Sequence, residues 1–285
     1  MKTLLVALTI GLCSLPVSAL PIRSVVAYGD SYSDNGNLGR ESNGPVIVED
    51  LAADLGVPLI DHAWVGATTG IGNLSDNGGL YTLGNRGYPG MMTSVNQDLV
   101  NPFPGFSNML VVVWGGHNDI LVNGQDQGVI NIVNIVRKLQ AIGAQNILVP
   151  GVMDLGLTPF GNGQPSANRQ RLSAISNAFN SSLQNALPPG VIYFDTAGVL
   201  RDIIANPAAY NLTNVTAGCS LTPACANPDQ YLFWDFFHPT AHMNTIFAAD
   251  FAQAVQAVPE PSISALVGIG ILLSGVMVRT VHKGL

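Results

Sequence analysis

Two stretches far apart in the chain carry residue types that together can perform nucleophilic catalysis. Ser31 lies in Gly29-Asp30-Ser31, directly after an apolar run, and His238 lies three residues after Asp235 near the end of the chain. A serine hydroxyl is a weak nucleophile at neutral pH, so it needs a neighbouring base, and a carboxylate can orient an imidazole that serves as this base. The pattern predicts Ser31 as nucleophile, His238 as base and Asp235 as the orienting acid.

Two further residues offer groups that can stabilise an oxyanion. Gly66 can present a backbone N–H where a side chain would obstruct the substrate, and Asn118 can offer a side-chain amide. With the N–H of Ser31 they form a predicted oxyanion hole, in which one donor is worth roughly 3–4 kcal/mol of barrier. This chemistry requires neither a metal nor a cofactor, and we expect none.

Apolar runs and amphipathic stretches alternate along the chain. The expected strands are residues 24–28, 58–60, 109–114, 147–149 and 191–194, and the expected helices are residues 46–55, 129–142, 167–187 and 242–255. Strands that alternate with helices of ten or more residues predict a parallel sheet with helices on both faces. We therefore expect a three-layer α/β/α sandwich.

The predicted sheet places the candidate residues at one edge. Ser31, Gly66 and Asn118 each follow an expected strand, and ligands bind at the carboxyl edge of the strands in open α/β sheets. Residues 70–90 are rich in glycine and asparagine and are predicted to form a long surface loop of the kind that often carries function.

Composition and motifs exclude several classes of protein. Asp and Glu outnumber Lys and Arg by 18 to 11, so binding to nucleic acid has no electrostatic basis. The sequence lacks the glycine-rich phosphate loop of NTPases, the dinucleotide fingerprint Gly-x-Gly-x-x-Gly and the Gly-x-Ser-x-Gly elbow of ordinary α/β-hydrolases. These absences disfavour an NTPase, a Rossmann dehydrogenase and an ordinary α/β-hydrolase.

The beginning of the chain is typical of a secretory signal peptide. Lys2 precedes an apolar run at residues 4–15, and Val17-Ser18-Ala19 is a small-x-small cleavage site. We expect residues 1–19 to be removed during export and residues 20–257 to form one domain.

The other end resembles a PEP-CTERM sorting tail of Gram-negative bacteria. In residues 258–285, the triplet Pro259-Glu260-Pro261 precedes an uncharged run at residues 263–278 and a basic end. The resemblance implies membrane contact through this tail, cleavage by a sorting protease, and a final location outside the cell, at its surface or in the extracellular matrix. A plain C-terminal membrane anchor is the alternative.

The remaining cysteines and histidines suggest structural roles. Cys219 and Cys225 lie in one loop, and export to an oxidising compartment favours a local disulfide over a metal pair. His117 is expected to form a structural hydrogen bond, and His242 is expected to cap the last helix. His62 has no evident partner and is also expected to be structural.

Four motifs in order resemble those of the SGNH/GDSL hydrolase superfamily. They are Gly29-Asp30-Ser31, Gly66-Ala67-Thr68, Gly116-His117-Asn118-Asp119, and Asp235 through His238. The resemblance implies the SGNH fold, with a flavodoxin-like parallel sheet, and an esterase or lipase activity. Residues 40–46 are also similar to a segment of the branch that includes bacterial phospholipid acyltransferases and thermolabile haemolysins. Asp61 and Val65 depart from the Asn and Gly of many relatives.

Together these observations predict an exported serine ester hydrolase that acts on a lipid or an acylated carbohydrate. One alternative is a polysaccharide acetylesterase on the same fold. Another is a non-catalytic surface or matrix protein that uses the fold for binding. The acyl-chain length and the choice between water and an alcohol as acceptor stay open at this stage.

Overall fold

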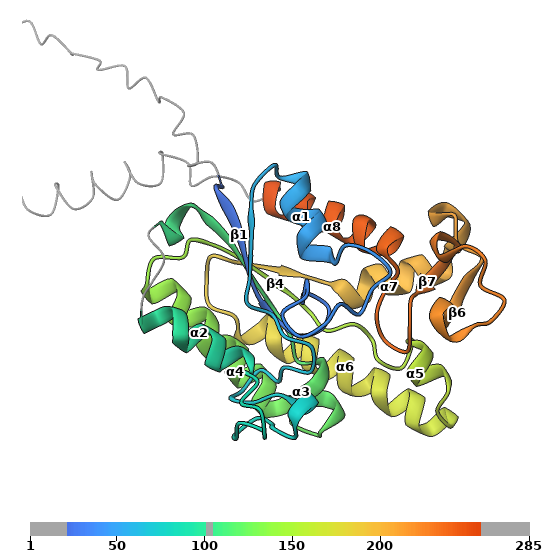
Figure 1. Cartoon of the computed structure of the whole chain (residues 1–285), viewed down its shortest axis with the longest axis horizontal. Helices are drawn as coiled ribbons and strands as arrows, with labels where there is room; N and C mark the ends of the chain where they lie inside the picture. Colours follow the sequence, from blue (N-terminus) through green and yellow to red (C-terminus); the bar gives the residue numbers. More distant parts are fainter. Residues whose placement is uncertain (1–21, 101–104, 258–285) are drawn as a thin grey trace, which may run out of the picture. The chain divides into compact units, whose positions relative to one another are not determined.

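A parallel five-stranded sheet runs through the centre of the computed structural model, which describes residues 22–100 and 105–257 (Figure 1). The described residues from Ile22 to Ala257 belong to one compact unit. The predicted signal peptide at residues 1–19 and the predicted tail at residues 258–285, in which we expect residues 263–278 to form a membrane helix, lie outside the described residues. Within the described ranges, no helix is long and apolar enough to cross a membrane.

The sheet has the strand order β2-β1-β3-β4-β5, which confirms the predicted parallel, flavodoxin-like arrangement. The strands are β1 (Ser24–Gly29), β2 (Leu59–Asp61), β3 (Met109–Trp114), β4 (Asn146–Pro150) and β5 (Val191–Phe194). Strand β1 pairs with β2 on one side and with β3 on the other. From β1 the chain first adds β2 on one side and then crosses over to add β3 on the other side. Sheets of this kind bind ligands at the carboxyl ends of the two strands between which this crossover occurs.

Helices cover both faces of the sheet, as the sandwich prediction requires (Figure 1). Along β1, Val25 and Ala27 belong to one buried core, and Val26 and Tyr28 belong to the other. Continuous apolar strands such as β3 arise because both of their faces are buried. One core includes α1 (Ile47–Asp54), α7 (Thr196–Ala205) and α8 (Ala241–Gln256), and the other includes α2 (Met91–Val100), α4 (Gln125–Ala141) and α6 (Ser166–Ala186).

Several elements were not expected from the sequence. They are α2, α7, the short helices α3 (His117–Leu121) and α5 (Pro159–Asn162), and a small second sheet of β6 (Asn214–Gly218) and β7 (Tyr231–Phe233). Single 3-10 turns are η1 (Leu74–Asp76), η2 (Phe106–Asn108), η3 (Pro207–Tyr210), η4 (Cys219–Leu221) and η5 (Pro228–Gln230).

Helix α4 begins four residues before the expected start and contains Gly128. A Cβ atom at that position would lie 2.9 Å from Oδ1 of Asp119, so close packing explains a glycine inside this helix.

Residues 70–90 form the expected long loop, and their backbone also pairs with itself. The N–H of Ile71 donates to the carbonyl oxygen of Leu80 at 3.0 Å. A Cβ atom at Gly70 would lie 2.0 Å from that same oxygen. The glycines thus permit close backbone contact, and the segment brings Leu74 and Ser75 to the pocket described below.

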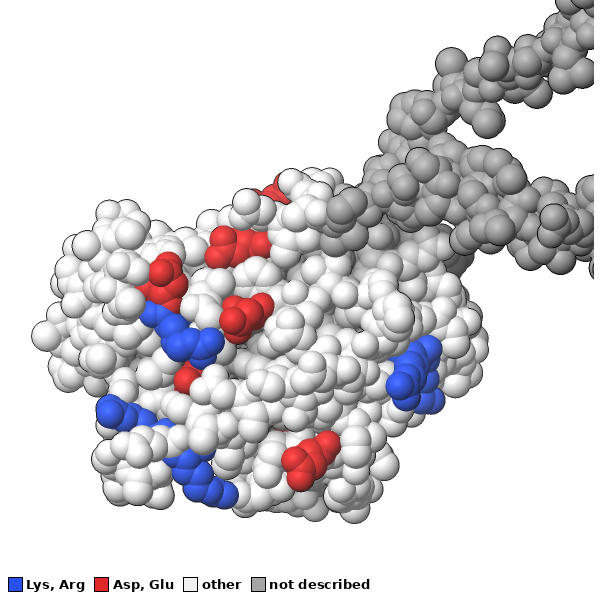
Figure 2. All heavy atoms as spheres, turned by 180° about the vertical axis from the view of Figure 1, so that it is seen from behind, with Lys and Arg blue, Asp and Glu red and all other residues white. Residues whose placement is uncertain are grey.

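Charged side chains are sparse on the face seen in Figure 2, in agreement with the 10% of charged residues in the sequence. Lys and Arg lie singly or in small groups on this face and are separated by broad uncharged areas.

Candidate active site

Ser31 lies in a tight turn at the carboxyl end of β1. The carbonyl oxygen of Asp30 accepts hydrogen bonds from the N–H groups of Ser33 and Asp34, both at 3.1 Å, which bends the chain around Ser31. A Cβ atom at Gly29 would lie 2.8 Å from the carbonyl oxygen of Trp114, so the turn can form against β3 only with glycine there. The half-buried Ser31 side chain then lines a pocket at this edge.

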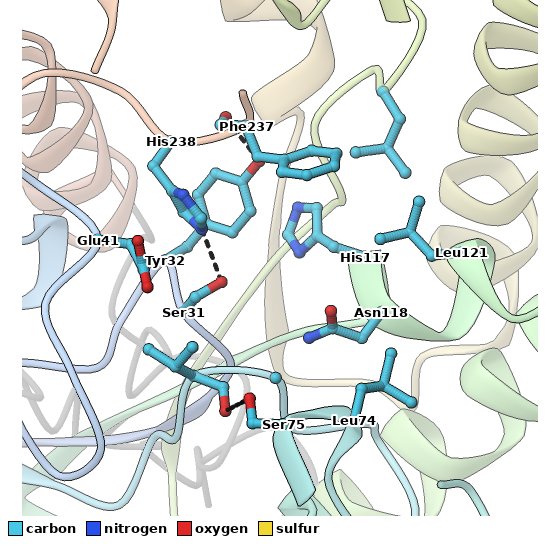
Figure 3. A pocket seen from close by; sticks show the side chains of 13 residues that line it. Ser31, Tyr32, Glu41, Leu74, Ser75, His117, Asn118, Leu121, Phe237 and His238 are labelled. Carbon is cyan, nitrogen blue, oxygen red and sulfur yellow. Dashed lines mark hydrogen bonds between the residues drawn. The ribbon is translucent and has the colours of Figure 1, made fainter. Parts of the chain in front are cut away.

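The structure brings the three predicted catalytic residues into one hydrogen-bonded chain (Figure 3). Ser31 Oγ lies 2.7 Å from His238 Nε2, although the two residues are 207 positions apart. The other ring nitrogen, Nδ1, lies 2.8 Å from Asp235 Oδ2 and 3.0 Å from Oδ1. The network fits a neutral imidazole whose Nδ1–H donates to Asp235 and whose Nε2 accepts the serine proton.

Asp235 is held in place by its own backbone turn. Its Oδ1 accepts the N–H groups of Phe237 and His238, each at 2.8 Å. Burial by itself raises the pKa of this carboxyl, but the hydrogen bond and charge interaction with the His238 ring and these two N–H groups hold the pKa below its ordinary value. Asp235 is therefore ionised at neutral pH and can stabilise a protonated His238.

Gly66 and Asn118 lie in the same pocket as Ser31. Gly66 has a φ of +79°, and a Cβ atom there would lie 2.2 Å from Oγ of Ser75, so only glycine fits. Asn118 Nδ2 donates to the carbonyl oxygen of Ala67 at 2.9 Å, which fixes the amide and leaves its second N–H for another acceptor. Within the described residues, the N–H groups of Ser31 and Gly66 donate to no other residue. The predicted oxyanion donors thus line one pocket with N–H groups that other residues do not occupy, and their joint role as an oxyanion hole stays a prediction.

The pocket has a cavity volume of about 270 Å³ and is open to solvent. Beside the polar groups, its walls are the apolar side chains of Val65, Leu74, Leu121, Leu155 and Phe237. These side chains give the pocket beside Ser31 an apolar lining.

His117 has the structural role that the sequence predicted. It is buried, its Nδ1 lies 2.9 Å from Asp30 Oδ2, and its Nε2 accepts the N–H of Met153 at 3.1 Å. Both ring nitrogens are engaged, so His117 is not available to accept a proton from Ser31.

Two expectations about the other histidines are wrong. Thr240, not His242, caps α8, because its Oγ1 accepts the N–H of Met243 at 3.4 Å. His242 instead places Nε2 3.2 Å from the carbonyl oxygen of Tyr210. His62 does have a partner, since its Nε2 lies 3.5 Å from Asp98 Oδ2.

The predicted cysteine pair forms a disulfide next to the site. Cys219 and Cys225 are bonded and close a short loop. Within that loop, Ser220 donates its N–H and its hydroxyl to the carbonyl oxygen of Trp234, at 2.8 and 2.7 Å. The disulfide loop thereby supports the backbone directly before Asp235.

Sequence reasoning missed three residues that build this site. Tyr32 places its ring between two histidines, with ring centroids 4.2 Å from His117 and 4.9 Å from His238. Asp119 is buried and accepts both the N–H and the hydroxyl of Thr69, and burial raises its pKa to about 6. Glu41 lines the pocket. The signals available were the adjacency of Tyr32 to Ser31, the place of Asp119 in the motif that carries Asn118, and the place of Glu41 within residues 40–46. The contacts themselves join distant segments.

Among the described residues, one group of potential metal ligands is close enough to hold an ion. It consists of Glu41, Asp235 and His238, whose ligand atoms lie within 4.8 Å of one another. Both ring nitrogens of His238 already contact Asp235 or Ser31, so an ion bound to this ring would compete with those hydrogen bonds. We predicted that ester hydrolysis by this protein needs no metal, and this stays a prediction.

The profile of the GDSL-like Lipase/Acylhydrolase family matches residues 25–251. This match covers most of the chain, so the chain belongs to the GDSL-like lipase/acylhydrolase family. It is accordingly a carboxylic ester hydrolase.

Three GDSL esterase/lipases of Arabidopsis thaliana are similar to this chain. Two are 26% identical, over 75% and 80% of this chain and 77% and 80% of the relatives. The third is 28% identical over 74% of this chain and 73% of the relative.

Solved structures with a similar fold include two bacterial hydrolases. A lipase/acylhydrolase of Enterococcus faecalis is 16% identical, with 84% of this chain and 99% of that chain covered and a TM-score of 0.42. The acetylxylan esterase Axe2 of Geobacillus stearothermophilus is 13% identical, with 84% and 96% covered and a TM-score of 0.48.

Proposed function

We propose that the protein cleaves carboxylic esters through an acyl-enzyme on Ser31. The observation that carries this proposal is the chain of contacts from Ser31 Oγ to His238 Nε2 at 2.7 Å and from His238 Nδ1 to Asp235 at 2.8 Å. This chain ends in the same pocket as the predicted oxyanion donors Gly66 and Asn118. A nucleophile, its base, an orienting acid and an oxyanion hole are together sufficient for acyl transfer.

In the first half of the reaction, Ser31 Oγ forms a bond to the ester carbonyl carbon while its proton passes to His238 Nε2. The carbonyl oxygen takes the negative charge and accepts hydrogen bonds from the N–H groups of Ser31 and Gly66 and from Asn118 Nδ2. Collapse of this tetrahedral intermediate breaks the bond to the alcohol oxygen, which receives the proton from His238. The acyl group stays on Ser31.

In the second half, water attacks the acyl carbon and gives a proton to His238. Collapse of the second intermediate returns this proton to Ser31 Oγ and releases the carboxylic acid. An alcohol in place of water would give a transferase reaction with the same steps, as in the acyltransferase branch that residues 40–46 resemble. The apolar walls of the pocket favour an aliphatic acyl chain over acetyl.

A ladder of nitrophenyl esters from acetyl to palmitoyl tests this function. The purified protein should hydrolyse them with a preference for chains longer than acetyl, and Ser31→Ala should lose the activity. A preference for acetyl would support the acetylesterase alternative. A folded protein that hydrolyses none of the esters would contradict the enzyme proposal and favour the binding protein.

We further propose export, with removal of residues 1–19 and processing of the PEP-CTERM-like tail at residues 258–285. The Cys219–Cys225 disulfide supports this proposal, because such bonds persist in oxidising compartments. Mass analysis of the protein released by its native host should give a chain that begins at Leu20 and lacks the tail. A full-length chain inside the cell would contradict the proposal, and a retained tail would favour the plain membrane anchor.

A further inference from the structure

Glu41 places a carboxylate at the edge of the catalytic pocket that the ester chemistry does not use. One of its oxygens lies within 4.8 Å of both a carboxylate oxygen of Asp235 and a ring nitrogen of His238. The residue is half-buried and lines the pocket. Among the described residues that line this pocket, Glu41 is the only acid, and none is a lysine or an arginine. Its charge is therefore not offset within the pocket.

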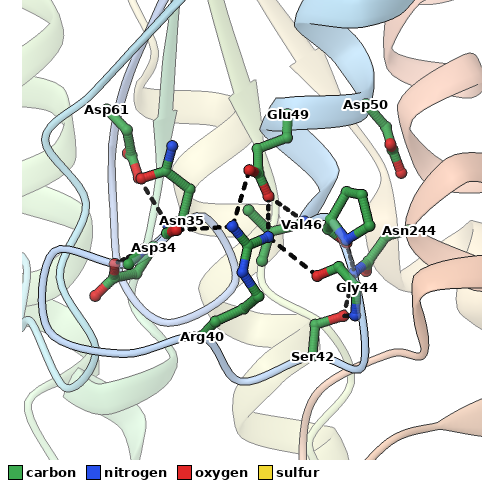
Figure 4. Close-up of polar contacts among 12 residues, drawn as sticks. Asp34, Asn35, Arg40, Ser42, Gly44, Val46, Glu49, Asp50, Asp61 and Asn244 are labelled. Atoms are coloured by element: carbon green, nitrogen blue, oxygen red, sulfur yellow. Dashed lines mark hydrogen bonds and ion pairs between the residues drawn. The ribbon is translucent and has the colours of Figure 1, made fainter.

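The preceding residue does not neutralise Glu41, because Arg40 points to another partner (Figure 4). Arg40 donates to both carboxylate oxygens of Glu49, with 3.0 Å between Nη2 and Oε1. It also donates to the carbonyl oxygens of Asn35 at 2.8 Å and Gly44 at 3.1 Å. The Arg40 charge is thus paired with Glu49, and the Glu41 charge stays with the pocket.

The residues after Glu41 are anchored to the first turn of α8, shortly after His238. Asn43 Oδ1 accepts the N–H of Ala241 at 2.8 Å. Asn244 Nδ2 donates to the carbonyl oxygen of Pro45 at 2.8 Å and to Ser42 Oγ at 3.1 Å. Since the chain is fixed on both sides of Glu41, the position of its backbone beside the catalytic base is also fixed.

The reaction geometry indicates which part of a substrate meets Glu41. A carbonyl over Ser31 directs its oxygen toward Gly66 and Asn118, and its leaving oxygen must approach His238 to receive a proton. In the view of Figure 3, Glu41 lies on the His238 side of Ser31 and Asn118 lies on the other side. The alcohol portion of the ester therefore passes next to Glu41.

We propose that Glu41 selects substrates by the charge of their alcohol portion. It favours esters whose alcohol portion carries a positive charge, accepts neutral ones and disfavours anionic ones such as those with a phosphate, sulfonate or carboxylate. This inference rests on the proposed ester hydrolysis at Ser31 and adds a specificity-determining residue to it. Because part of the pocket is open to water, we expect a charge effect on the order of tenfold for an alcohol of single charge.

Three butyrate esters that differ in the charge of the alcohol test this proposal. They are the esters of choline, of its neutral isostere 3,3-dimethylbutanol, and of 3-hydroxypropanesulfonate. All three give the same butyryl-enzyme, so differences in kcat/KM report the acylation step, in which the alcohol is still bound. Acid release is followed by titration, with the full-length protein and the variants Glu41→Gln and Glu41→Lys.

In the native protein, kcat/KM should fall in the order choline, 3,3-dimethylbutyl, sulfopropyl. Glu41→Gln should reduce the choline-to-sulfopropyl ratio about tenfold, and Glu41→Lys should reverse the order. Asp54→Asn is the matched control, because it removes one negative charge from the exposed end of α1 and should leave the ratio within about twofold of native. If Glu41→Gln hydrolyses all three esters with an unchanged choline-to-sulfopropyl ratio, the role of Glu41 is overturned while the proposed ester hydrolysis stands. Hydrolysis of none of them would overturn both proposals.

Discussion

The hydroxyl of Tyr32 donates a 2.9 Å hydrogen bond to the carbonyl oxygen of Phe237. This single contact connects the residue after the nucleophile to the residue before the base. The Tyr32 ring also lies against the ring of His238, with 4.9 Å between centroids. The turn that carries Ser31 and the loop that carries His238 are therefore held in register by a side chain that takes no part in the chemistry.

We expect Tyr32→Phe to lower kcat severalfold with little change in KM, because the His238 loop loses its anchor while the pocket walls stay in place. Loss of this hydrogen bond should cost about 1 kcal/mol of unfolding free energy. Tyr28→Phe is the matched control, since this buried tyrosine donates to Asp98 Oδ2 at 2.7 Å without contacting the catalytic residues. Equal losses of kcat in the two variants would contradict a positioning role for Tyr32.

Gly66→Ala should impair activity much more than the replacement of a glycine far from the pocket by alanine. The added methyl group would meet Ser75 Oγ at 2.2 Å, so the N–H of residue 66 must move away from the oxyanion position. We expect kcat to fall on the order of 100-fold. Gly56 has a similar φ of +66°, but a Cβ atom added there would meet nothing within 4 Å. Gly56→Ala should therefore cost only about 1–2 kcal/mol of stability. Kinetics and thermal melts of both variants check this, and a Gly66→Ala enzyme with near-native kcat would refute the assignment.

Asp61 should make the stability of the protein depend on pH between about 4 and 7. Burial raises its pKa from 3.8 to about 7, even though it accepts the N–H groups of Asn35 and Ala63. In this window the folded protein retains a proton that the unfolded chain has lost, so the unfolding free energy falls as pH rises. The fall is at most about 1.4 kcal/mol for each pH unit.

Melting temperatures from pH 4 to 7.5 test this effect of Asp61. Asp61→Asn carries no titratable group at this position, so its melting temperature should fall less steeply with rising pH than that of the native protein. Asp54→Asn, at an exposed site, should keep the native slope. Parallel slopes for the native protein and Asp61→Asn would show that Asp61 titrates normally.

Loss of the disulfide should weaken both stability and activity. The bond between Cys219 and Cys225 closes a loop of about seven residues, for which chain entropy predicts about 2 kcal/mol. The hydroxyl of Ser220 in this loop donates a hydrogen bond to the carbonyl oxygen of Trp234, next to Asp235. The double variant Cys219→Ser/Cys225→Ser should therefore also lower kcat moderately. Denaturant unfolding and ester kinetics measure the two effects. An unchanged kcat would show that the loop does not support Asp235.

Much of the sheet and of the candidate site could be predicted because the signals were local. Strand β3 is a continuous apolar run because both of its faces are buried, and it was predicted with its observed bounds. Ser31, Gly66, Asn118 and the segment of Asp235 and His238 each lie in a short motif. The order of these motifs, with three of them after expected strands and the fourth before the last helix, was sufficient to propose that they meet at one edge of the sheet.

The features that were missed depend on contacts that periodicity and short motifs do not encode. Hydrophobic periodicity does not predict the backbone pairing within residues 70–90. The glycines that permit it are also typical of loops without such pairing. The place of Glu41 depends on two hydrogen bonds between residues about 200 positions apart: Asn43 Oδ1 accepts the N–H of Ala241, and Asn244 Nδ2 donates to the carbonyl oxygen of Pro45. His242 was assigned as a helix cap by proximity, whereas the hydroxyl of Thr240 reaches the free N–H.

The measurement that tests the account most directly is covalent trapping of the nucleophile. A small fluorophosphonate should add once to the native protein, and digestion with trypsin should place the adduct on Ser31 within the peptide of residues 24–40. Ser31→Ala should take up no label. Ser75→Ala, which changes the other serine that lines the pocket, should still be labelled. Adduct on another residue, or unchanged labelling of Ser31→Ala, would contradict the assignment of Ser31 as the nucleophile.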